Sequence, residues 1–90
     1  MSRLRKTPPD DHLKRAWAYA CAAADFDALA DLRVTAAAAQ RLSGNVMDAL
    51  RMENAATLCE RRAAECDGMC RGHFFRYREL VESTAEVCRG

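Results

Sequence analysis

A repeat of small and apolar side chains at alternating steps of three and four residues runs through the second half of the chain, and it limits the possible folds. Its members are Ala49, Met52, Ala56, Cys59, Ala63, Cys66, Cys70, His73, Tyr77, Leu80, Thr84 and Val87. Steps of three and four keep side chains on one face of an α-helix, as in a heptad repeat. We therefore expect one continuous helical face over residues 46–87, packed against another helical surface.

The first half of the chain contains two shorter repeats of the same kind. They comprise Leu29, Leu32, Ala36 and Ala39, and, nearer the start, Leu13, Trp17 and Ala20. We expect both to face the longer repeat. Because many of these side chains are small, the helix backbones are expected to approach closely.

The sequence predicts an all-α fold. Both prolines precede Asp10, and no stretch alternates convincingly as a strand does. Turn signals at Asp25–Asp27, Ser43–Asn45 and Asp67–Gly68 divide the chain into helices over residues 11–24, 26–42, 46–66 and 70–88. This predicts a small bundle of three to four helices. If the first and third breaks do not occur, the alternative is a two-helix hairpin about Gly44 that dimerises into a four-helix bundle.

Length and charge set the domain organisation and the classes of partner. Residues 1–9 are expected to form a flexible tail, and residues 10–90 a single helical domain. The net charge of +1 does not favour nucleic acid as a partner. No apolar stretch approaches the roughly 20 residues of a membrane span, and the start lacks a secretion signal. The interpretation is a cytoplasmic protein without a membrane partner, whose five cysteines are free thiols.

One group of residues has the chemistry of a metal site. Cys66, Cys70 and His73 share a helical face, and thiolates with an imidazole suit zinc or cuprous copper. All three also occupy positions where the repeat needs a small or apolar side chain, and buried free cysteine packs as a small hydrophobe. The favoured interpretation is therefore packing without a cofactor, with zinc or copper binding as the alternative.

A second group is typical of a protein interface. Basic and aromatic residues alternate after Cys70, and helical geometry divides them into two faces. Phe74, Tyr77, Val81 and Cys88 are expected to face inward. The outer face is expected to carry a partner-binding strip, which consists of Arg71, Phe75, Arg78 and Glu82.

A third pattern, over residues 35–52, has small and apolar residues at roughly the positions of a helix-turn-helix unit. Its second helix would present Asp48 and Glu53 to DNA phosphates, which repel carboxylates. A DNA-binding regulator is therefore only an alternative hypothesis.

No catalytic motif indicates that this chain is an enzyme. It contains neither a phosphate-binding glycine loop nor a His-Glu-x-x-His motif, and no Ser, His and Asp grouping is evident. The hypothesis that remains is a non-enzymatic protein–protein interaction module acting through exposed helix faces. Adaptors, regulators and inhibitors, including phage-encoded ones, fit that description, and a homodimer is a further expectation.

Overall fold

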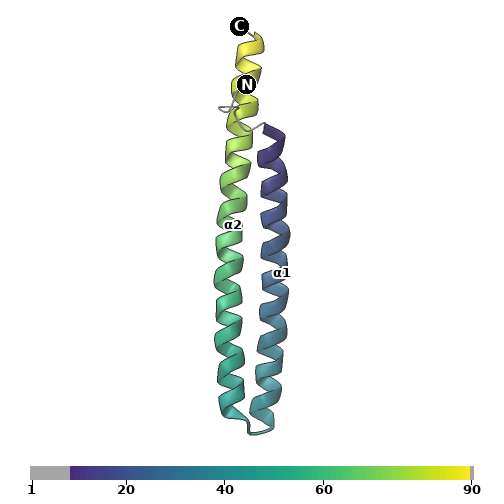
Figure 1. Ribbon diagram of the computed structural model, residues 1–90, viewed down its shortest axis with the longest axis vertical. Helices are drawn as coiled ribbons and strands as arrows, with labels where there is room; N and C mark the ends of the chain where they lie inside the picture. The colour runs from purple at the N-terminus through teal and green to yellow at the C-terminus, as the bar shows by residue number, and fades with distance from the viewer. Residues whose placement is uncertain (1–8, 90) are drawn as a thin grey trace, which may run out of the picture.

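The computed structural model describes residues 9–89, with side chains described for residues 9–85. Helix α1 covers Pro9–Leu42 and helix α2 covers Val46–Arg89, with 34 and 44 residues. The helices run antiparallel and side by side, and α2 extends beyond the start of α1 (Figure 1). The all-helical prediction is confirmed. The expectation of three to four helices is wrong, and the two-helix hairpin is the form observed.

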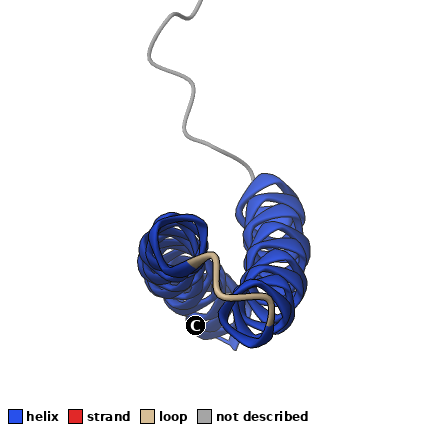
Figure 2. Cartoon of the chain, turned by 90° about the horizontal axis from the view of Figure 1, so that it is seen from below, coloured by secondary structure: helices blue, strands red, loops and turns tan. Residues whose placement is uncertain are grey.

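Gly44 makes the reversal possible. It has a φ of +82°, which L-amino acids with a side chain rarely adopt. The Gly44 N–H donates to the Arg41 carbonyl at 3.0 Å, and the Asn45 N–H donates to the Gln40 carbonyl at 2.8 Å. These two bonds form a Schellman motif, which satisfies carbonyls left free at the end of α1. The Asn45 carbonyl then accepts the Ala49 N–H at 3.0 Å, which is the first backbone hydrogen bond of α2. Seen from the turn, a short loop joins two adjacent helices (Figure 2).

The predicted breaks at Asp25 and Gly68 do not occur, because both residues lie within continuous helix. Asp25 is exposed, so its carboxylate remains in water and does not need to cap a new helix. A glycine inside a helix costs about 1 kcal/mol relative to alanine. A long, cooperative helix packed along a neighbour tolerates that cost at Gly68.

Helix α1 begins at Pro9, which the sequence had assigned to the tail. Proline suits the first helical position, since its fixed φ is already helical and its missing N–H would have no partner there. Asp10 and Asp11 occupy the first turn, where carboxylates interact favourably with the helix dipole. The rest of the predicted tail, residues 1–8, lies outside the described residues.

Alanine makes up most of the seam between the helices. In the described part of the chain, the buried apolar side chains are Ala16, Ala23, Ala30 and Ala37 of α1, and Ala49, Ala56, Cys59 and Ala63 of α2. On both helices the alanines recur every seven residues. Ala30, Ala56 and Cys59 form one cluster, against which Phe26 packs. Since alanine buries little area, this seam yields less hydrophobic stabilisation per residue than a leucine core.

The predicted seam of α2 is largely confirmed. Beyond the buried positions, Met52, Cys66, Cys70, His73, Tyr77 and Leu80 are partly buried. Thr84 is exposed, since it lies eleven residues beyond His73, which pairs with His12, whereas α1 begins only three residues before His12. The side chain of Val87 is outside the described range.

The predicted seam of α1 is wrong. Trp17 is 72% exposed and Leu32 is 67% exposed, while alanines displaced from the predicted positions face α2. Two registers with the same helical period exist in α1, one rich in leucine and one in alanine. The alanine register forms the seam because the facing alanines of α2 allow close approach there.

The hairpin is long and thin. It measures 69 Å along its longest axis and 13 Å along its shortest, with a radius of gyration of 20.2 Å. A compact chain of this length has a radius of gyration of about 12 Å. A structure one helix thick has no second layer to cover its outer faces, so most of the large apolar side chains remain exposed to solvent.

Candidate functional site

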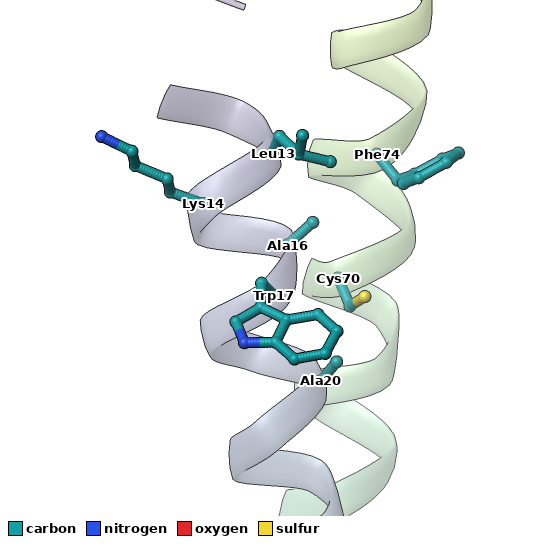
Figure 3. Close-up of a pocket in the computed structure, with 7 residues that line it drawn as sticks. All are labelled: Leu13, Lys14, Ala16, Trp17, Ala20, Cys70 and Phe74. Atoms are coloured by element: carbon teal, nitrogen blue, oxygen red, sulfur yellow. The ribbon is translucent and has the colours of Figure 1, made fainter. Parts of the chain in front are cut away.

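An apolar groove lies on one flank of the hairpin, near its open end. Leu13, Lys14, Ala16, Trp17 and Ala20 of α1 and Cys70 and Phe74 of α2 line it (Figure 3). Its volume is about 480 Å³. The Trp17 indole lies across the space between the helices, whereas the Lys14 ammonium points away from α2.

The groove exists because bulky residues follow seam residues directly in sequence. Leu13 follows His12, Trp17 follows Ala16, and Phe74 follows His73. Each step along a helix turns by about 100°, so residues after seam positions lie on one flank and residues before them lie on the other. We call the flank that carries this groove the groove face. Trp17 is 72% exposed and Phe74 is 47% exposed, so the groove has an apolar floor and apolar walls open to water.

Below the groove, towards the turn, the groove face becomes acidic. Glu60 and Asp67 lie fourteen and seven residues before Phe74, and Asp27 lies seven residues after Ala20, so all three share this flank. All three are exposed. Further towards the turn, Glu53 forms an ion pair with Arg41 across the two helices. The groove therefore adjoins a region of exposed carboxylates.

A histidine pair joins the helices at the level of the groove. The Nδ1 atoms of His12 and His73 lie 3.0 Å apart, so one ring donates a hydrogen bond to the other. The Tyr19 ring stacks on His73, with 5.7 Å between ring centroids and 9° between planes. These rings fill the seam near the open end, on either side of the buried Ala16 of α1. A hollow of about 270 Å³ opens beside the pair on the flank opposite the groove, lined partly by Gly68, Gly72 and Arg76.

The surroundings of His12 lower its pKa below the usual value of 6.5. The largest cause of the lowered pKa is loss of hydration, followed by electrostatic repulsion from His73, Arg76 and Arg15; Asp11 opposes them. The neutral form of His12 is therefore favoured in the folded hairpin.

The residues proposed from sequence as a metal site are not gathered into one. Cys66 and Cys70 are partly buried in the seam, and His73 pairs with His12. Among the described side chains, no group of three or more His, Cys, Asp or Glu is placed to hold a metal ion. The described cysteines, Cys21, Cys59, Cys66 and Cys70, are free thiols.

The strip proposed from sequence runs between the outside of α2 and the groove face, since Arg71 and Arg78 directly follow the seam residues Cys70 and Tyr77. Arg71, Phe75, Arg78 and Glu82 are all exposed, and Arg78 forms an ion pair with Glu82 at 3.8 Å. The expectation that Phe74 and Val81 face inward is wrong, since they are 47% and 41% exposed. Tyr77 is partly buried as expected, and the side chain of Cys88 lies outside the described residues.

The helix-turn-helix alternative does not match the geometry around Gly44. In such a unit the helices cross steeply, so that the second one can enter the major groove. Here the helices on either side of the turn pack along each other (Figure 1). Residues 46–52 are thus held against α1.

Sequence reasoning missed the groove because it placed Leu13, Trp17 and Ala20 in the seam. One signal could have indicated the groove. Trp17 directly follows Ala16, the first of four alanines that recur every seven residues, so a seam of alanines places Trp17 beside it.

No protein-family model, curated protein or solved structure matches this chain. Within the described residues, neither helix has a segment both long and apolar enough to pass through a bilayer.

Proposed function

We propose that this chain is a non-enzymatic protein-interaction module whose groove face binds an amphipathic helix of another protein. One observation carries the proposal: Trp17 and Phe74, two of its largest apolar side chains, lie in an open groove and not in the seam. Aromatic residues that gain burial on binding are the usual anchors of protein interfaces. Helix-in-groove recognition requires an apolar channel of this kind.

The acidic region next to the groove defines the partner's chemistry. A helix that filled the groove and continued towards the turn would meet Asp27, Glu60 and Asp67. Lysine or arginine on that helix would be attracted to these carboxylates, whereas glutamate would be repelled. The proposed partner segment therefore has large apolar residues at helical spacing, followed by basic residues.

The strip of Arg71, Phe75, Arg78 and Glu82 is a second candidate surface, favoured by the 63% exposure of Phe75. The groove has the stronger support because two helices contribute to it, and because a concave site can enclose a partner side chain while a single convex helix face cannot. We further propose a cytoplasmic location, which the free thiols of the described cysteines support.

Photo-cross-linking from two adjacent positions tests the proposal. Phe74 and Phe75 are neighbours in sequence but point to different sides of α2. A benzophenone amino acid at position 74 in the source cell is expected to cross-link one protein, through a segment that mass spectrometry identifies as apolar and basic. The same probe at position 75 is the matched control.

A synthetic peptide of the cross-linked segment then provides the quantitative check. We expect its binding to weaken at least roughly tenfold with Trp17→Ala and to change little with Phe75→Ala. Cross-links from position 75 alone, cross-links only between copies of this chain, or an acidic partner segment would each contradict the proposal.

A further inference from the structure

The flank opposite the groove face carries a patch of leucines. Leu29 precedes the seam residue Ala30, and Leu58 precedes the seam residue Cys59, so both lie on this flank. Ala30 and Cys59 belong to one buried cluster, which places the two leucines at the same level of the hairpin. Leu32, one turn from Leu29, extends the patch. Leu29, Leu32 and Leu58 are 37%, 67% and 58% exposed. We call this the leucine face.

The chain exposes more surface to solvent than a compact protein of the same mass. The surface measures 7118 Å², whereas a compact protein of 10.0 kDa exposes about 5,200 Å². The excess of roughly 1,900 Å² is more than twice the about 800 Å² that each partner buries in an interface of standard size. The elongated shape therefore leaves more surface exposed than one interface of standard size requires.

Charge determines which flank suits a second copy of the same chain. In a two-fold dimer the same patch meets itself, so a like charge near the axis faces its own copy. The middle of the groove face carries Asp27 and Glu60, which would repel their copies. The leucine face carries fewer unpaired carboxylates: the exposed one beside its leucines is Asp25, seven residues before Leu32. There Arg51 pairs with Asp48 at 3.3 Å and Arg62 pairs with Glu65 at 3.5 Å, one pair on each side of Leu58.

We infer that two copies of this chain pair through their leucine faces, forming a four-helix bundle with both groove faces outward. Leu29, Leu32 and Leu58 lie at the centre of this interface, and the two ion pairs lie at its rim. Alanines on the same flank, among them Ala22, Ala36 and Ala55, allow close approach of the second hairpin. Each bundle then presents two grooves, so the dimer is bivalent for the partner of the proposed function.

The test is the mass in solution, measured by light scattering during size-exclusion chromatography at several concentrations. The unmodified chain is expected at about twice its 10.0 kDa mass. Leu32→Glu and Leu58→Glu are each expected to shift it towards the single-chain mass and to weaken dimerisation at least roughly tenfold. Trp17→Glu, a matched change on the groove face, is expected to leave the dimer intact.

Several other results would contradict the inferred dimer. A single-chain mass for the unmodified protein at all concentrations overturns the inference, as does a dimer lost with Trp17→Glu and kept with Leu58→Glu. Because the glutamate variants could reduce folding, Leu58→Ala is measured as well, with circular dichroism on every sample. A helical Leu58→Ala chain whose dimer is no weaker than the unmodified one contradicts the inference. The groove experiment uses different positions, so either idea can fail alone.

Discussion

His12 of α1 and His73 of α2, 61 residues apart in sequence, share a hydrogen bond between their Nδ1 atoms at 3.0 Å. The pair lies where the alanine seam ends. It joins the two helices near the open end of the hairpin, beside the groove, so its protonation affects how firmly the start of α1 is held.

Acid is expected to weaken the hairpin through this pair. Because the pKa of His12 is lowered in the folded state, the unfolded chain takes up a proton more readily. The contribution of His12 is therefore fully present above its ordinary value of 6.5 and is lost as the pH falls through the lower folded value. We expect the thermal midpoint, followed by circular dichroism, to fall between neutral and mildly acidic pH. The His12→Gln variant is the control, and an equally steep fall in that variant would exclude His12 as the cause.

Enlarging a seam alanine is expected to separate the helices. Ala30 and Ala56 are 3% and 2% exposed, so a leucine at either site has no space. Overpacking of this kind costs about 1–3 kcal/mol. Urea unfolding of Ala30→Leu should show such a loss. Ala28→Leu, on the exposed face of α1, should change stability by no more than about 0.5 kcal/mol. Similar stability for the two variants would mean that the seam is not closely packed.

Glycine substitutions are expected to act in opposite directions at the turn and within α2. At Gly44, with a φ of +82°, an alanine side chain is strained, and Gly44→Ala should cost about 1–2 kcal/mol. At Gly72 an added Cβ meets nothing within 4 Å, so Gly72→Ala should stabilise the helix by up to about 1 kcal/mol. The midpoints of denaturant unfolding measure both changes in stability. Stabilisation by Gly44→Ala would contradict the turn described here.

Thiol reactivity is expected to distinguish the seam from the surface. Cys21 is exposed, while Cys59 is 5% exposed within the alanine cluster. Iodoacetamide labelling followed by peptide mass spectrometry should modify Cys21 first, and Cys59 only as the helices open. Equal rates under native conditions would show that the seam does not exclude water.

The fold could be predicted from the sequence to the extent that local signals determine it. The turn at Gly44 followed from the turn signal at Ser43–Asn45, and the seam of α2 followed from an uninterrupted repeat. The helix breaks at Asp25 and Gly68 could not be judged locally, because packing along the whole partner helix offsets a weak glycine or aspartate signal.

The groove depends on a choice of register that the sequence left open. Apolarity alone favours placing Leu32 and Trp17 in the seam of α1. The structure places alanines there, since facing alanines allow close approach and larger side chains do not. The large side chains are then left outside, where they line the groove and the leucine face.

The accessibility of Trp17, the only tryptophan in the chain, tests the central claim most directly. Its indole is 72% exposed, and pairing through the leucine faces leaves it uncovered. Fluorescence of the purified protein should show a red-shifted emission that acrylamide and iodide quench readily, and the partner peptide should shift the emission to the blue and block quenching. A blue-shifted Trp17 that resists quenching in the purified protein alone would contradict the account, because the groove would then already be filled.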